Sequence, residues 1–286
     1  LMTTGKDKNV FNIAVKGNFD DCQNLVKSMF SDKEFANQIN MSGVNSINWA
    51  RIIAQSVYYF YCYFLAEDEN QPINFSVPTG NFGDVYAGYL AKKLGLPINK
   101  LIVATNQNDI LHRAISKGKY ETEYVSETIS PSMDIQIASN FERLIYDLNN
   151  HDSSQTLDDM KNIKQNGKYT IDDEKLKKIN QDFLSARMSE QETLDVIKNI
   201  YEKFNMVLDP HTAIGYGAFD KHDLKGNNIV LATAHPCKFP DAILKAINLK
   251  SDLPDELKFI LDEKENYGII ENNLKEIKQY ILGKIK

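Results

Sequence analysis

The feature that most constrains the fold is a strand, a glycine-rich turn and a helix that follow one another within residues 74–94. Residues 74–78 are short and apolar enough for a buried strand, and residues 85–94 repeat apolar side chains at helical spacing until Gly95. The turn between them, residues 79–84, contains two glycines. A strand that leads directly into a helix in this way is the first half of a strand–helix–strand unit, which requires a parallel sheet.

The same alternation continues along the chain. We predict strands at 10–15, 74–78, 100–105 and 227–232, and helices at 20–30, 46–66, 85–94 and 108–117. Residues 134–204 and the tail from 253 are predicted to be mostly helical, and residues 118–135 to form a polar surface excursion or lid. Units of this spacing predict an α/β fold with a parallel sheet and helices on both faces.

The turn at 79–84 has the chemistry of a phosphate site. Backbone N–H groups at a helix start converge on an anion, and the helix dipole adds attraction. Gly80 and Gly83 would supply the tight turn, while Thr79 and Asn81 could donate side-chain hydrogen bonds. The alternative is an ordinary turn in which Asp84 caps the helix, since the pattern matches neither the dinucleotide fingerprint nor the nucleotide P-loop.

A second polar motif, at residues 233–236, follows the strand predicted at 227–232. Ligands bind such sheets at the carboxyl ends of the strands. Both motifs stand at strand ends, so we expect them to hold one flat cofactor together.

Composition limits the partners. The net charge of −6 argues against a broad nucleic-acid surface. Cys22, Cys62 and Cys237 lack the spacing of a metal site, so we predict no metal and a reducing, cytoplasmic location. Residues 52–66 are apolar but too short to span a membrane, and a buried helix is the better interpretation.

The word Ser76-Val77-Pro78-Thr79-Gly80-Asn81-Phe82-Gly83-Asp84 resembles the cofactor-phosphate loop of threonine synthase, specifically the long fungal and bacterial type. Similar words occur in the same order over nearly the whole chain, at residues 1–4, 19–23, 44–51, 87–89, 92–98, 104–111, 139–144, 208–213 and 232–236. The resemblance implies a fold-type II pyridoxal-phosphate enzyme, similar to tryptophan synthase β. It also implies conversion of O-phospho-L-homoserine and water to L-threonine and phosphate.

One part of the family pattern is missing. The family holds its cofactor on a lysine in a Ser-Phe-Lys-Asp-like segment, and no such segment occurs in this sequence. Residues 238–241 look alike but follow the Ala-His-Pro word, which is a downstream position of the family. We therefore expect a C-terminal portion with no catalytic residue of its own, and the lysine upstream of Leu1 in an N-terminal part. Residues 1–50 would end the smaller domain, and residues 51–286 would form the large cofactor domain, with a helical insertion at about 134–204.

The resemblance assigns the cofactor phosphate to Thr79, Gly80, Asn81, Phe82, Gly83 and Asp84. It assigns the ring nitrogen to the hydroxyl of Thr233, which favours elimination and replacement over transamination. The alternative for Thr233 is a hydroxyl that caps the next helix.

Five residues are predicted to contact the substrate. Ser46, Asn48 and Arg51 stand at a predicted helix start, where they could bind the substrate's phosphate. His211 and His235 could line the site, although both could also be structural, with Thr212 capping the helix after His211. Two other functions stay open: a related phospho-lyase, and a non-catalytic relative or fragment without the lysine.

Overall fold

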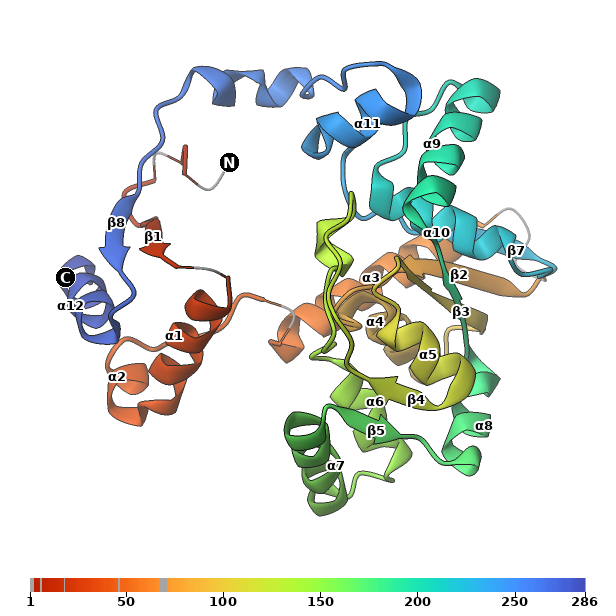
Figure 1. Ribbon diagram of the computed structural model, residues 1–286, viewed down its shortest axis with the longest axis horizontal. Coiled ribbons are helices and arrows are strands. Elements are labelled where there is room, and N and C mark those ends of the chain that lie inside the picture. The colour runs from red at the N-terminus through yellow and green to blue at the C-terminus, as the bar shows by residue number, and fades with distance from the viewer. Residues whose placement is uncertain (1–2, 6, 18, 46, 67–70, 286) are drawn as a thin grey trace. The chain divides into compact units, whose positions relative to one another are not determined.

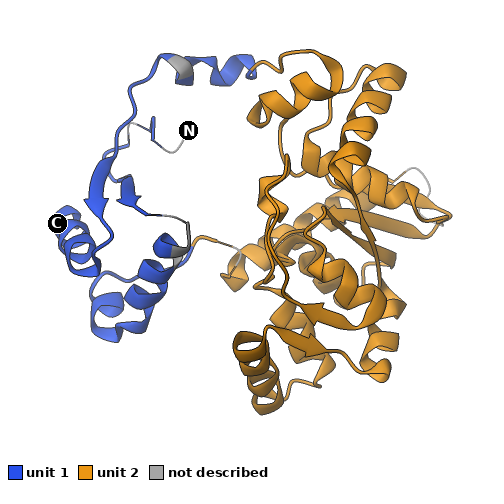
Figure 2. Cartoon of the chain, in the orientation of Figure 1, with its two compact units in different colours: residues 1–43, 253–286 blue, residues 44–252 orange. Residues whose placement is uncertain are grey.

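The computed structural model describes residues 3–5, 7–17, 19–45, 47–66 and 71–285. The chain divides into two compact units, residues 1–43 with 253–286 and residues 44–252, which Figure 2 colours separately. This division differs from the predicted domains, because residues 253–286 group with the N-terminal segment and not with the large α/β unit.

A parallel sheet forms the centre of the larger unit (Figure 1). In the described residues its strand order is β6 (Phe183–Arg187), β3 (Ile98–Thr105), β2 (Ile73–Pro78) and β7 (Asn227–Val230). Each neighbouring pair is parallel. All residues of β2 are buried, as expected for a strand that is covered on both faces. The predicted parallel sheet is confirmed.

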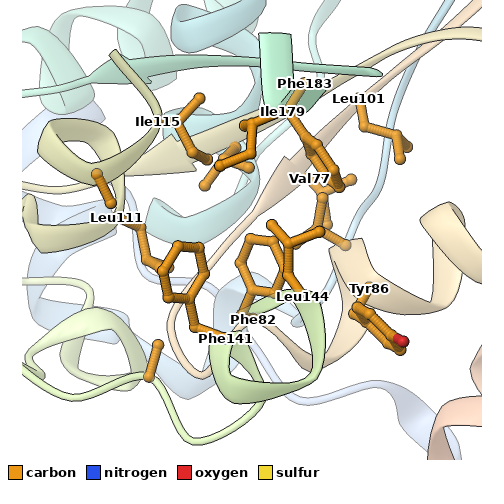
Figure 3. Packing of buried hydrophobic residues seen from close by; sticks show 14 of the residues in the cluster. Val77, Phe82, Tyr86, Leu101, Leu111, Ile115, Phe141, Leu144, Ile179 and Phe183 are labelled. Carbon is orange, nitrogen blue, oxygen red and sulfur yellow. The ribbon is translucent and has the colours of Figure 1, made fainter. Parts of the chain in front are cut away.

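Helices cover both faces of this sheet. The helices of the larger unit are α3 (Trp49–Phe64), α4 (Gly83–Lys93), α5 (Ile110–Lys117), α6 (Phe141–Leu148), α7 (Ser153–Asn166), α8 (Asp173–Asp182), α9 (Glu190–Phe204), α10 (Pro210–Asp220) and α11 (Pro240–Ile247). Leu101 and Val103 of β3 join a core with α3, α4 and α5, part of which Figure 3 shows. Ile102 and Ala104 pack instead with α10. The alternation follows from the two-residue period of a strand.

Residues 134–204 are less uniformly helical than predicted. They include β5 (Lys168–Thr170), which pairs antiparallel with β4 (Lys119–Glu121), and β6, which pairs with β3 in the central sheet. Both strands are short and lie between charged helices, so no strand periodicity marks them in the sequence. The region is therefore not a purely helical insertion.

The smaller unit is built from both ends of the chain. It contains β1 (Ile13–Lys16), α1 (Phe19–Ser31), α2 (Lys33–Gln38), a 3₁₀ helix η3 (Asp255–Asp262), β8 (Gly268–Glu271) and α12 (Leu274–Lys284). β1 and β8 pair in parallel, with Ile13 opposite Gly268. Leu25, Met29, Phe35 and Ile277 form its small core. The helical prediction for the tail is confirmed for α12 but missed β8, whose partner is more than 250 residues away.

α3 is the apolar helix of the sequence. Ile52, Ser56 and Tyr59 are buried against the larger unit, which confirms the predicted buried helix for this side of α3 only. In the described ranges, no helix combines the length and apolar character needed to cross a bilayer.

Candidate functional site

The two predicted motifs meet in one pocket. β2 and β7 are neighbours, with Ser76 opposite Val230, and the Leu231 N–H donates to the Ser76 carbonyl at 3.0 Å. The chain after β7 therefore runs beside the turn after β2. Together they line a cavity of about 250 Å³, whose walls are Gln55, Pro78, Thr79, Gly80, Asn81, Phe82, Gly83, Asp84, Ser132, Met133, His211, Thr233, Ala234, Lys238 and Phe239. The expected convergence at the sheet edge is present.

The start of α4 is an uncapped helix terminus. Phe82 occupies the N-cap position without a side-chain hydrogen bond, so the alternative in which Asp84 caps the helix is wrong. The N–H groups of Gly83, Asp84 and Val85 have no partner within the described ranges, and the first helical bond from Tyr86 returns to Phe82. Unpaired N–H groups and the positive end of the helix dipole face one pocket wall, which suits an anion.

The tight turn comes from Phe82 and not from a glycine. Phe82 has φ of 63°, in the left-handed region, whereas neither Gly80 nor Gly83 has positive φ. Its ring is buried and packs edge-on against Phe141, with centroids 5.2 Å apart. Figure 3 shows the two rings as neighbours in the core. Core packing therefore stabilises a backbone conformation that is rare for an aromatic residue, and strain of this kind is typical of functional sites. Phe82 contributes backbone, not its ring, to the anion site.

Gly80 is required for close approach to the segment η1 (Pro131–Met133). A Cβ at position 80 would lie 2.3 Å from the Ser132 carbonyl oxygen. η1 is fixed by Asp134, whose carboxylate accepts hydrogen bonds from Asn106 at 2.7 Å and from Thr128 at 2.7 Å. Residues 118–135, which the sequence predicted as a surface excursion or lid, thus include β4 and η1. The turn η1 is held by hydrogen bonds and forms one wall of the pocket.

Other residues of the turn have defined partners. The Thr79 hydroxyl is buried and donates to the Val77 carbonyl at 2.6 Å, so its proton is not directed to the pocket, contrary to expectation. Asn81 is exposed and its carbonyl accepts from Asn140. The Asn81 amide makes no hydrogen bond within the described residues and remains available to a ligand.

Asp84 carries an unusual carboxyl group. It lies in the first turn of α4, lines the pocket, and accepts a hydrogen bond from the buried Tyr59 hydroxyl at 3.2 Å. Burial raises the pKa of Asp84 to about 6, although the hydrogen bond from Tyr59 opposes the shift. The group is therefore about half protonated near pH 6 and mostly ionised at neutral pH, so the unpaired N–H groups of α4 must offset its charge when an anion binds beside it.

His211 presents an unpartnered nitrogen. Its ring is only 4% exposed and lines the pocket, with Nδ1 3.1 Å from Asp209 Oδ1. The other nitrogen, Nε2, is buried and has no partner in the described part of the chain. Asp209 also caps α10, so the alternative cap at Thr212 is wrong. Nδ1 is held by Asp209, so Nε2 is the ring nitrogen that remains available to a pocket ligand.

Asp209 is kept charged by its neighbours. Although burial raises the pKa of Asp209, hydrogen bonds from His211 and Thr212 bring it below its ordinary value. A charged Asp209 fixes the orientation and tautomer of the His211 ring.

Several pocket residues were not singled out from the sequence as site residues, among them Gln55, Lys238 and Phe239. Gln55 of α3 lines the pocket, and its buried Oε1 has no partner in the described ranges. Lys238 supplies a cation to the wall, and its Nζ lies 6.0 Å from the Phe239 ring centroid. The Phe239 ring packs against His211 at 4.8 Å. Nothing in the sequence pattern marks Gln55, but the pairing of Lys238 with the Ala-His-Pro word could have indicated a wall residue.

The predicted substrate residues divide into two groups. Thr233 is exposed and lines the pocket, and it does not cap the following helix, because His235 Nδ1 accepts from Cys237 N at 3.2 Å. His211 is also in the wall. His235, in contrast, serves as that local cap and is not part of the wall.

The start of α3 lies outside the pocket wall as well. Asn48 caps α3 by accepting from Ala50 N at 2.9 Å, and Arg51 Nη1 donates to the Val44 carbonyl at 2.9 Å. Ser46 falls outside the described residues.

A larger cavity of about 780 Å³ in the same unit does not have this chemistry. Its Arg143 is already bound to Asn140 Oδ1 at 2.9 Å and to the Ile47 carbonyl at 2.8 Å. Its Asp147 accepts from the Tyr86 hydroxyl at 2.9 Å. In the described ranges, no group of histidine, cysteine and carboxylate side chains could hold a metal ion.

Comparisons with known proteins agree with this geometry. A family model described as "Threonine synthase, C-terminal" matches residues 212–281. Threonine synthase of Pseudomonas aeruginosa is 42% identical over 283 residues, which are 98% of this chain and 60% of that protein. Threonine synthase of Saccharomyces cerevisiae is 45% identical, over 94% of this chain and 58% of that protein.

A solved structure extends the likeness to three dimensions. The crystal structure of pyridoxal-phosphate-bound threonine synthase from Brucella melitensis superposes with a TM-score of 0.93 at 45% identity, covering 99% of this chain and 61% of that one. The chain thus spans about three fifths of the length of the relatives it matches. By sequence and by fold, the chain belongs to the threonine synthase family and corresponds to the C-terminal portion of its members.

Proposed function

We propose that this chain is the cofactor-binding portion of a pyridoxal-phosphate-dependent threonine synthase, which converts O-phospho-L-homoserine and water to L-threonine and phosphate. The observation that carries the proposal is the pocket between β2 and β7. It combines an uncapped helix terminus, a strand-end hydroxyl and a buried imidazole nitrogen without a partner, in a chain of this family.

The pocket residues fit the cofactor. The three unpaired N–H groups of Gly83, Asp84 and Val85 would hold its phosphate, with the Asn81 amide at the rim. The Thr233 hydroxyl, on the neighbouring strand end, would face the ring nitrogen. When bound, pyridoxal phosphate supplies an electron sink for negative charge on the substrate's carbon atoms.

The remaining wall residues have roles that follow from their chemistry. His211 Nε2, oriented by Asp209, would accept a proton or hydrogen bond from a pocket ligand. Lys238 would offset the charge of a substrate that carries both carboxylate and phosphate. The predicted roles of Ser46, Asn48, Arg51 and His235 at the substrate stay predictions, and the Arg51 variant below tests one of them.

The lysine that holds the cofactor is proposed to come from the N-terminal part of the enzyme. Two fifths of each relative lies outside the match to this chain, and the sequence contains no Ser-Phe-Lys-Asp-like segment. That N-terminal part would be the chain's partner, in the same cytoplasmic enzyme. The three cysteines are free thiols, which suits a reducing compartment.

The test is borohydride reduction of the purified protein with pyridoxal phosphate, followed by peptide mass mapping. We expect one pyridoxyl label, on a lysine that precedes Leu1. A label on Lys238 would move the attachment site into this chain and overturn the proposed division of roles. Absence of any specific label would favour a non-catalytic relative or fragment.

Product analysis separates the synthase from a phospho-lyase. The purified protein would be supplied with O-phospho-L-homoserine, and amino-acid and keto-acid products would be quantified by chromatography. Equal amounts of threonine and phosphate support the synthase. Phosphate released without threonine would assign the lyase reaction instead.

A further inference from the structure

α3 has an apolar side that no other described part of the larger unit covers. Six large side chains on this side are between 49% and 70% exposed, namely Ile53, Val57, Tyr58, Tyr61, Phe64 and Leu65. Ile53, Val57 and Tyr61 are spaced by four residues, and Phe64 and Leu65 extend the same surface by one turn. We call these six residues the α3 stripe.

The stripe is unusual because the opposite side of α3 is also apolar. Ile52 and Tyr59 are fully buried there, and the Tyr59 ring packs on Phe75 at 4.8 Å. After Arg51, α3 contains no charged residue. A helix that is apolar all round is normally buried on all sides, and a contiguous exposed apolar surface marks an interaction site. Exposed tyrosines are typical of such interfaces.

The position of the stripe indicates its occupant. Gln55 lies in the same helix and reaches the candidate pocket, where its Oε1 lacks a partner in the described ranges. A segment that brings a lysine to this pocket from outside the chain must therefore pass close to α3. The relatives contain such additional chain, since two fifths of their length lies outside the match.

We propose that the α3 stripe is the surface on which the N-terminal part of the enzyme packs, so that this part delivers its lysine past Gln55. The proposal rests on the proposed function for the identity of that lysine. The proposal adds an interaction surface to the proposed function. It also places α3 between the two parts of the enzyme, with one apolar side packed on the larger unit and the other packed on the N-terminal part.

Photo-cross-linking tests this assignment on the protein as expressed from its own gene. Tyr61 is replaced by p-benzoylphenylalanine, and Phe204, which is 64% exposed on α9, is replaced in a control. We expect the Tyr61 probe to cross-link to a peptide that precedes Leu1, and the Phe204 probe not to do so. Four results would overturn the proposal: cross-links to a second copy, cross-links to residues 3–43 or 253–285, no cross-link, or an intact mass of only 32.6 kDa.

A stability comparison provides a second readout. Phe64→Lys should lower the melting temperature by about 5 °C or more if the stripe is covered, since a charge would then be buried. Phe204→Lys, with a side chain of similar exposure, should leave it nearly unchanged. Equal melting temperatures for the two variants would contradict a covered stripe.

The two proposals fail separately. A normal pyridoxyl label with the Tyr61 probe cross-linked to a second copy would overturn the stripe assignment and leave the function intact. A cross-link from the Tyr61 probe to a peptide that precedes Leu1, without any pyridoxyl label, would support the stripe assignment and overturn the proposed function.

Discussion

Replacing Asp84 by Asn should stabilise the larger unit at neutral pH. The carboxyl pKa is raised from 3.8 to about 6 by burial at the pocket wall. A shift of about 2 units corresponds to about 3 kcal/mol between the two protonation states. Ionisation of Asp84 lowers the free energy of unfolding by this amount. An asparagine amide does not ionise, so the variant keeps that stability.

The pH dependence follows from the sign of the shift. Between pH 4 and 6 the folded state binds more protons than the unfolded state, so the free energy of unfolding falls as pH rises through this range. Below pH 4 the Asp84 carboxyl is protonated in both the folded and the unfolded state, so it does not lower the free energy of unfolding. Well above pH 6 the carboxyl is ionised in both states, and the free energy of unfolding is lowered by the full amount. Asp84→Asn should therefore exceed the parent by up to about 3 kcal/mol at pH 7.5, and match it at pH 4.

Urea unfolding at the two pH values measures this difference. The single tryptophan, Trp49, lies in α3 and reports on the larger unit. Asp173→Asn is the matched control, because Asp173 is also in a first helical turn but is exposed. The control should lose a few tenths of a kcal/mol from the helix dipole. An Asp84→Asn variant that loses as much as the control at pH 7.5 would refute the argument.

Three further changes test the site. Gly80→Ala should weaken pyridoxal-phosphate binding at least tenfold in an absorbance titration, since the new Cβ would lie 2.3 Å from the Ser132 carbonyl oxygen. Gly283→Ala is the control, because a Cβ at position 283 would have no heavy atom within 4 Å. Equal cofactor affinities for the two variants would remove Gly80 from the anion site. Lys238→Met should raise KM for O-phospho-L-homoserine about tenfold, the value of one charge-assisted hydrogen bond, with cofactor absorbance unchanged. An unaltered KM would exclude Lys238 as an anion contact. Arg51→Ala should also raise KM if the predicted substrate contact is correct, whereas normal kinetics would leave Arg51 with its Val44 hydrogen bond alone.

The local sequence pattern was sufficient to predict part of the secondary structure. β2, the turn and α4 could be predicted because the strand, the glycines and the helical period adjoin in sequence. β1 and β8 could not be paired in advance, because their partners are more than 250 residues apart. β6 was missed because five residues between two charged helices carry too little periodicity.

The site shows the same limit at the level of single residues. Thr233 and His211 line one pocket, and both stand at strand-end or helix-start signals that the sequence shows. The left-handed backbone of Phe82 depends on Phe141, which is distant in sequence, so the turn was assigned to its glycines instead. Gln55 was missed because its neighbours in α3 are apolar and only the fold directs it to the pocket.

The pairing of β1 with β8 has a consequence for synthesis on the ribosome. β1 emerges more than 250 residues before its partner. At about 5–20 residues per second, this strand waits roughly 10–50 s for β8. During that time the larger unit, complete at residue 252, can already fold. β1 and the helices that follow it thus lack part of their core until β8 and α12 are made, and within residues 7–285 nascent chains should be most sensitive to proteases and chaperone binding at residues 7–43.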